Sequence, residues 1–266
     1  METSNLTGRR IAEYLDEGKR FDGRGLDEFR ELIIERDISN KAEGSVRVRL
    51  GKTEVLVGVK MGVAEPYPDS PNKGNLMVTA EILPLSSPRV EIGPPKFPAI
   101  ELGRLVDRGI RESKFVDFEK LCIKEGEKVW QVFVDVYSIN DDGNLVDAAA
   151  IGAVAALSIA KMPKYDEKEG KILYGEFTDE NFPLTKDIPI TVTAYKIGKN
   201  VIIDPTLEEE DVNEAKVTIG ATADGYISSL QKGNSTSISI KEMENIIDVT
   251  EKARKNLFAK LEKFLK

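Results

Sequence analysis

The stretch 129–160 changes from a strand pattern to a helix pattern, and the rest of the chain is organised around it. Apolar and polar side chains alternate from Trp130 to Val136, with the period of two that is typical of a strand. A polar loop, 140–144, follows. Residues 147–157 are then small and apolar on nearly every side, which predicts a helix that is buried on most of its faces.

Apolar periodicity predicts further elements on both sides of this stretch. Two alternating segments flank the turn at Gly51-Lys52, which predicts a β-hairpin. Prolines and glycines mark the loops 66–75 and 84–98. The other predicted helices are 7–18, with a cap at Thr7, then 100–114 and 239–266. The predicted strands are 31–37, 45–50, 53–61, 76–83, 172–174, 190–196, 200–203, 215–221 and 226–231.

The order of these elements gives two successive β-rich halves, each followed by a helix, which predicts an α+β protein. We expect an N-terminal helix and connecting segment at 1–30 and a first domain at 31–187. A second domain with a C-terminal helix is expected at 188–266. The polar segment 163–181 is expected to be a connection that carries one short strand.

Composition narrows the class of protein. With 41% apolar and 32% charged residues in 266, the chain is typical of a globular protein. No apolar run is long enough to span a bilayer and the N-terminus lacks the layout of a signal peptide, so we expect a cytoplasmic protein. The absence of histidine excludes a Ser-His-Asp triad and imidazole metal ligands, and the single cysteine, Cys122, excludes an internal disulfide. The net charge of −8 argues against nonspecific wrapping of nucleic acid but leaves room for a local basic patch.

The predicted helix before the central strand carries three arginines on one face. Arg104, Arg108 and Arg111 follow each other at spacings of four and three residues. One interpretation is a solvated face, because Asp107 and Glu112 are spaced to pair with Arg111 and Arg108. The other is a cationic ridge for a polyanion. The pattern favours the solvated face and leaves the ridge open.

Two acidic segments raise the question of anion and metal binding. A strand, a loop and a helix N-terminus form a place where backbone N–H groups hold phosphate, but Asp141 and Asp142 in that loop would repel one. Further on, the segment 204–211 has five carboxylates in eight residues, and Mg²⁺ prefers such oxygen ligands. Consecutive carboxylates point in different directions, so the pattern favours an acidic, solvated turn or a helix N-terminus.

Several motifs, taken in their order and spacing, resemble the RNase PH family over about residues 20–255. Within that family the chain is most similar to the non-catalytic RNase PH-like subunit of the archaeal exosome. The motifs are Phe21-Asp22-Gly23-Arg24 followed by Glu28 and Arg30, Gly44-Ser45-Val46 leading to Gly51-Lys52-Thr53, the stretch 129–160, and Asp204-Pro205-Thr206 with Glu208-Glu209.

The resemblance implies a fold of two units like the second domain of ribosomal protein S5, with mixed sheets and helices packed on them, arranged in a ring of six. It also makes the departures informative. Active members hold phosphate with a Ser-Arg-Ser type loop, where this chain has Asp141 and Asp142. Active members also carry two metal-binding aspartates six residues apart, and the corresponding positions here are Glu210 and Lys216. The resemblance therefore implies a subunit that is inactive alone, with no catalytic residue, metal or cofactor of its own.

The resemblance also implies partners. Arg104, Arg108, Arg111 and Lys114 are expected to contact the phosphates of single-stranded RNA. The expected protein partners are a catalytic RNase PH-like exosome subunit, alternating with this chain in a hetero-hexamer built as a trimer of heterodimers, and RNA-binding cap subunits; no membrane is involved. Two alternatives stay open: a self-sufficient RNase PH-type phosphorolytic exoribonuclease that uses Glu210, and a free-standing RNA-binding module.

Overall fold

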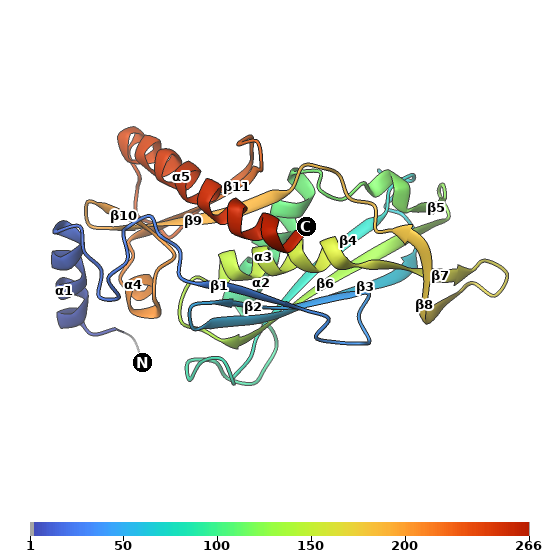
Figure 1. Ribbon diagram of the computed structural model, residues 1–266, viewed down its shortest axis with the longest axis horizontal. Coiled ribbons are helices and arrows are strands. Elements are labelled where there is room, and N and C mark those ends of the chain that lie inside the picture. The colour runs from blue at the N-terminus through green and yellow to red at the C-terminus, as the bar shows by residue number, and fades with distance from the viewer. Residues whose placement is uncertain (1–2, 266) are drawn as a thin grey trace.

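The structure, a computed structural model that describes residues 3–265, contains two β-sheets with a helix between them (Figure 1). The first sheet has the order β1-β2-β3-β6-β4, with β5 also paired to β6. All its pairings are antiparallel except that of β4 with β6. Its strands are β1 (Leu32–Arg36), β2 (Gly44–Leu50), β3 (Thr53–Ala64), β4 (Asn75–Ile82), β5 (Cys122–Lys124) and β6 (Lys128–Asn140).

The second sheet is antiparallel throughout, with the order β10-β9-β11-β12. Its strands are β9 (Pro189–Ile197), β10 (Asn200–Ile203), β11 (Ala215–Thr222) and β12 (Ile227–Gly233). The helices are α1 (Asn5–Asp16), α2 (Phe97–Glu112), α3 (Leu145–Ile159), α4 (Leu207–Asp211) and α5 (Ile240–Leu265), with a 3₁₀ turn, η1 (Phe118–Leu121). A hairpin, β7 (Lys161–Asp166) and β8 (Lys171–Asn181), projects from one end (Figure 1).

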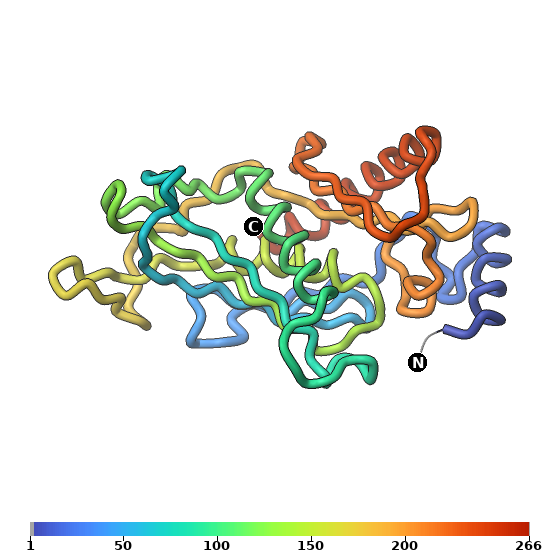
Figure 2. The backbone as a smooth tube through the Cα atoms, turned by 180° about the vertical axis from the view of Figure 1, so that it is seen from behind, coloured from blue at the N-terminus to red at the C-terminus, as the bar shows by residue number. Residues whose placement is uncertain are grey.

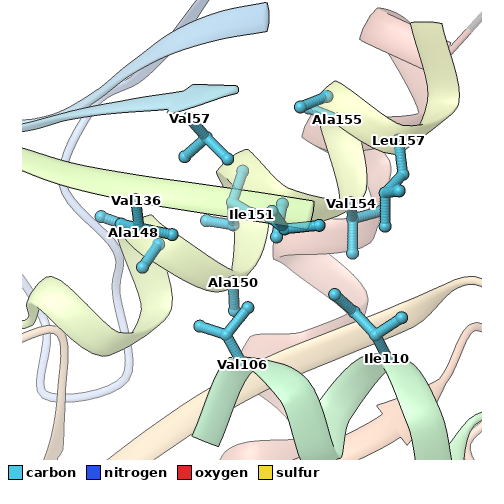
Figure 3. Packing of buried hydrophobic residues seen from close by; sticks show 14 of the residues in the cluster. Val57, Val106, Ile110, Val136, Ala148, Ala150, Ile151, Val154, Ala155 and Leu157 are labelled. Carbon is cyan, nitrogen blue, oxygen red and sulfur yellow. The ribbon is translucent and has the colours of Figure 1, made fainter. Parts of the chain in front are cut away.

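Helix α3 is the centre of the core. Every residue from Leu145 to Leu157 is buried, because α3 packs on β2 and β3 on one side and on β9 of the second sheet on another. Figure 3 shows Ala150 of α3 beside Val106 of α2. Small residues permit this close approach: a Cβ on Gly152 would lie 2.5 Å from Cγ2 of Val57.

The α+β architecture, the β2–β3 hairpin and the buried central helix are confirmed. In β6 the burial of side chains alternates as predicted: Trp130, Val132, Val134 and Val136 are buried and the residues between them are half-buried. The apolar pattern identifies these elements because each buries one face, or nearly all faces, in the core. No helix within residues 3–265 combines the length and the apolar character needed to cross a membrane.

Several predicted ends are wrong, for local reasons. Helix α1 begins after Ser4 and not at Thr7, because the Ser4 hydroxyl accepts a hydrogen bond from the Thr7 N–H. Helix α2 begins at Phe97, because Pro98 fits the first turn of a helix, and it ends before Lys114, which has a left-handed backbone (φ 58°). The last residue of the predicted helix 239–266 lies outside the described residues.

The prediction that the segment 163–181 is a connection with one short strand is wrong. Residues 161–166 and 171–181 pair as the hairpin β7–β8, and much of β8 is exposed. Its polar composition hides the hairpin, since neither face is covered enough to require an apolar alternation.

Candidate functional site

Three arginines from the segment between α1 and β1 meet two buried carboxylates of the second unit. Arg30 binds Asp204 twice, through Nε to Oδ2 at 2.9 Å and Nη2 to Oδ1 at 2.7 Å. Arg24 adds a contact from Nη1 to Asp204 Oδ2 at 3.2 Å, and Arg20 pairs with Glu209 through two nitrogens. Asp204 and Glu209 are only 0% and 3% exposed. The motifs at residues 20–30 and 204–209 therefore meet as one ionic network, as buried charges must.

The same network fixes the loop before α3. The two Nη atoms of Arg30 donate to the carbonyls of Asp142 (2.8 Å) and Gly143 (3.0 Å). Thr53 Oγ1 also donates to the Gly143 carbonyl, at 2.6 Å. Gly143 has φ 88°, and a Cβ there would lie 2.7 Å from the Pro205 carbonyl oxygen. This position therefore needs glycine, both for its backbone conformation and for the close approach of the second unit.

All four backbone N–H groups from Asp141 to Asn144 have acceptors within the chain. These acceptors are, in order, the Ser86 carbonyl (3.0 Å), Thr53 Oγ1 (3.3 Å), Asp141 Oδ1 (3.2 Å) and Glu210 Oε2 (2.7 Å). Asn144 is the N-cap residue of α3, so the Glu210 carboxylate lies at the helix N-terminus. A carboxylate of the chain thus occupies the kind of place where a helix end binds an anion.

The loop carboxylates predicted to repel phosphate differ in their surroundings. The Asp142 carboxylate lies 3.5 Å from Nη1 of Arg30, which balances part of its charge. At Asp141, burial raises the pKa, the Gly143 N–H and the charge of Arg89 oppose this shift, and the charges of Asp142 and Asp211 add to it. The loop therefore adds negative charge at the N-terminus of α3, as the sequence predicts.

Glu210 and Lys216 lie close enough to interact electrostatically. Burial raises the pKa of Glu210, and the Asn144 N–H and the Lys216 ammonium oppose that shift. Lys216 also pairs with Glu101 of α2, from Nζ to Oε2 at 3.2 Å. Within residues 3–265, no three carboxylate or thiol side chains converge on a place for a metal ion.

The acidic segment 204–211 is only partly solvated: Glu208 and Asp211 are exposed, but Asp204 and Glu209 are buried. It does begin a helix, α4, whose Thr206 and Glu209 form a capping box. Asp204 and Glu209 are buried because their arginine partners come from residues 20–30, which the local pattern could not reveal. The carboxylates of Asp204 and Glu209 therefore stabilise the fold by pairing with these arginines.

Asp147 and Tyr195 complete the buried polar group beside α3, and neither residue is among those predicted from the sequence. Asp147 accepts hydrogen bonds from Asn144 Nδ2 (3.0 Å) and from the N–H and Oγ1 of Thr193 (3.1 and 2.8 Å). Burial raises the pKa of Asp147 to about 7 and raises that of Tyr195 well above its ordinary value. The available signal was one aspartate in the first turn of an otherwise apolar helix.

The arginine face of α2 is exposed, but its members differ. Arg111 pairs with Asp107, from Nη2 to Oδ1 at 2.7 Å, and donates to the Leu76 carbonyl at 3.1 Å. The other expected helical pair, Arg108 with Glu112, is not formed. Across the described part of the chain, neither Arg104 nor Arg108 has a hydrogen bond or an ion pair, so both charges are available to a ligand.

Helix α2 lies alongside β4 (Figure 2). The predicted cations line two grooves that share Tyr67, one between α2 and β4 and the other between the C-terminal end of α2 and η1. The first groove, of about 480 Å³, is lined by Arg104 and Arg108, and the second, of about 510 Å³, by Arg111 and Lys114. The structure therefore brings the four predicted cations to these two grooves. Tyr67 lines both grooves and was not among the predicted residues.

Comparison with known proteins gives consistent matches over nearly the whole chain. The model of the "3' exoribonuclease family, domain 1" matches residues 28–163, and that of domain 2 matches residues 187–253. "Exosome complex component Rrp42" of Thermococcus onnurineus (strain NA1) is 48% identical over 242 residues, which cover 90% of this chain and 88% of that protein. The protein of the same name from Methanocella arvoryzae is 45% identical over 252 residues, 95% of this chain and 94% of that protein.

A solved structure agrees with the sequence matches. A chain of "archaeoglobus fulgidus exosome with RNA bound to the active site" superposes with a TM-score of 0.88 at 42% identity, covering 96% of this chain and 98% of that one. The two-unit RNase PH fold expected from the motifs is thereby confirmed. The chain belongs to the RNase PH family of 3′ exoribonucleases.

Proposed function

We propose that this chain is the non-catalytic structural and RNA-binding subunit of an archaeal exosome, a phosphate-dependent 3′–5′ exoribonuclease ring in the cytoplasm. Its partners are an active RNase PH-like subunit, which alternates with it in a hexamer built as a trimer of heterodimers, RNA-binding cap subunits, and single-stranded RNA. The relatives at 48% and 45% identity are named as exosome components, which supports the assembly. The main support for a lack of catalysis is that all four backbone N–H groups of the loop before α3 are hydrogen-bonded within the chain.

Phosphorolysis needs a bound phosphate as its attacking group, and its transition state is stabilised by positioning and charge. Here the donor at the α3 N-terminus, Asn144 N–H, is held by the Glu210 carboxylate at 2.7 Å. A phosphate would have to displace that carboxylate and approach Asp141, whose charge repels it. Lys216, close to Glu210, repels a divalent cation in turn. The site thus opposes both phosphate and metal.

The isolated chain is expected to release no nucleoside diphosphate from single-stranded RNA when phosphate and Mg²⁺ are supplied. The measurement is chromatographic detection of diphosphates, with the ring reconstituted from this chain and its active partner as the positive control. Robust, metal-dependent release by the isolated chain would contradict the proposal. That result would instead favour a self-sufficient RNase PH-type enzyme.

The RNA-binding role is supported by Arg104 and Arg108 of α2, which are exposed and have no hydrogen bond or ion pair with any residue that the structure describes. Each phosphate contact on a single strand contributes about 0.7 to the slope of log affinity against log salt concentration. Arg104→Ala and Arg108→Ala are therefore each expected to reduce that slope by about 0.7 in the assembled ring. The measurement is a salt titration of RNA affinity in phosphate-free buffer, so that the RNA is not degraded.

Two further variants calibrate this titration. Arg111→Ala is expected to have a smaller effect, because Arg111 already pairs with Asp107. Lys168→Ala, in the exposed turn between β7 and β8, is the matched control and should leave the slope unchanged. If Arg108→Ala behaves like Lys168→Ala, the arginines are a solvated helix face and do not contact RNA.

A further inference from the structure

Tyr67 lies where the two grooves beside α2 meet. The two grooves are called the α2 groove from here on. Tyr67 shares the first groove with Arg104 and Arg108 and the second with Arg111 and Lys114. The residue is 51% exposed, so a large aromatic surface faces solvent between two sets of cations. An exposed aromatic ring in a cationic groove is the arrangement by which proteins bind single strands through base stacking.

The charges of the α2 groove favour an anionic strand as its occupant. The lining includes five cations and three carboxylates, in a chain whose net charge is −8. Each carboxylate is paired within the chain: Asp107 with Arg111, Asp117 with Lys120, and Glu119 with Lys73 at 3.8 Å. Among the described residues, the side-chain charges of the lining left without a partner are those of Arg104, Arg108 and Lys114. A flexible polyanion can pair with these charges, whereas an apolar protein surface cannot.

Tyr67 is also held in place before any ligand arrives. It stands between Pro66 and Pro68, whose rings fix their backbone φ angles. Its carbonyl accepts the Ser70 N–H at 3.0 Å, and two further backbone hydrogen bonds tie this loop to the segment 118–126. A loop whose backbone is already ordered loses little backbone entropy on binding, which favours stacking.

We propose that Tyr67 stacks on a base of single-stranded RNA while Arg104 and Arg108 contact phosphates on one side of it and Lys114 contacts a phosphate on the other. This inference rests on the RNA-binding function proposed above and adds a platform for the bases. From Arg104 to Arg111, α2 rises about 10 Å, at about 1.5 Å per residue, and a stacked strand rises about 3.4 Å along its axis per phosphate, so these cations can contact more than one phosphate. Stacking does not distinguish the bases, so no sequence preference is expected from Tyr67.

The test measures RNA affinity of the assembled ring in phosphate-free buffer. Tyr67→Ala is expected to weaken binding of an unstructured RNA by about 5- to 150-fold, the range for loss of one stacked base, and to leave the salt slope unchanged. Tyr67→Phe keeps the ring and should bind like the unmodified chain. Tyr226→Ala, at a 75% exposed tyrosine that lines neither groove, is the matched control.

A second substrate separates stacking from other effects. On an RNA of equal length with abasic positions, the difference between the unmodified chain and Tyr67→Ala should disappear. Unchanged affinity in Tyr67→Ala, together with a reduced salt slope in Arg108→Ala, would overturn the stacking inference and leave the RNA-binding function intact. If neither variant changes RNA binding, the proposed RNA-binding function fails as well. If Tyr67→Ala prevents ring assembly, measured by light scattering, Tyr67 is a subunit contact and the inference is wrong.

Discussion

Replacing Arg30 by methionine is expected to lower the free energy of unfolding by about 3–5 kcal/mol. The substitution keeps much of the side-chain volume and removes the charge that faces Asp204, which is 0% exposed. It also removes the Arg30 donors to the carbonyls of Asp142 and Gly143, of which Gly143 keeps the Thr53 hydroxyl. Arg24 and Asn144 still contact Asp204, so the lower end of the range is expected.

The measurement is urea denaturation of the full chain, with Lys171→Met as control. Lys171 pairs with Glu169 on the exposed hairpin, and such pairs contribute about 0–1 kcal/mol. Asp204→Asn should show a loss comparable to that of Arg30→Met, and the double variant should lose less than the sum of the two, because both remove the same interaction. A loss in Arg30→Met no larger than in Lys171→Met would show that the buried pair does not hold the two units together.

This network shows which parts of the structure the sequence could predict. The strand from Trp130 to Val136 and the buried helix after it follow from the periodicity of apolar residues, which local burial imposes. The burial of Asp204 does not follow from this periodicity, because its partner Arg30 is 174 residues away in sequence. The acidic segment around Asp204 has the composition of a solvated turn, and only tertiary contacts make it part of the interior.

The charges of the candidate site could be predicted from the sequence, but its hydrogen bonds between distant segments could not. The pattern at Asp141 and Asp142 indicated a helix N-terminus unsuited to phosphate, and both carboxylates lie in the loop before it. It gave no sign that the Glu210 carboxylate would accept the Asn144 N–H, since side-chain to backbone contacts between distant segments leave no periodic trace. The grooves beside α2 depend in the same way on β4 lying next to α2, so the placement of Tyr67 could not be read from spacing.

Asp147 predicts an unusual dependence of stability on pH. Burial raises its pKa to about 7 from the ordinary value of 3.8, so the folded chain binds this proton more tightly than the unfolded chain does. The stability that this group contributes is therefore fully present below about pH 4 and is lost as the pH rises through 7. At about 1.4 kcal/mol for each pH unit of difference, the loss over the whole window is about 4 kcal/mol.

Asp147→Asn is expected to remove this dependence and to make the chain more stable than the unmodified protein at pH 8. An asparagine amide can donate to the hydroxyl of Thr193, which can then donate to Thr218 Oγ1, 3.1 Å away, so the hydrogen bonds are retained without a charge. Between pH 5 and 8, the difference in unfolding free energy between variant and unmodified chain should grow by about 2–3 kcal/mol, measured by urea denaturation at each pH. Taking the difference cancels the other carboxylates, such as Asp141 and Glu210, whose pKa values are also raised by burial. A difference that stays constant from pH 5 to 8 would mean that Asp147 is ionised across this range, and that its three hydrogen bonds stabilise the charge more than burial opposes it.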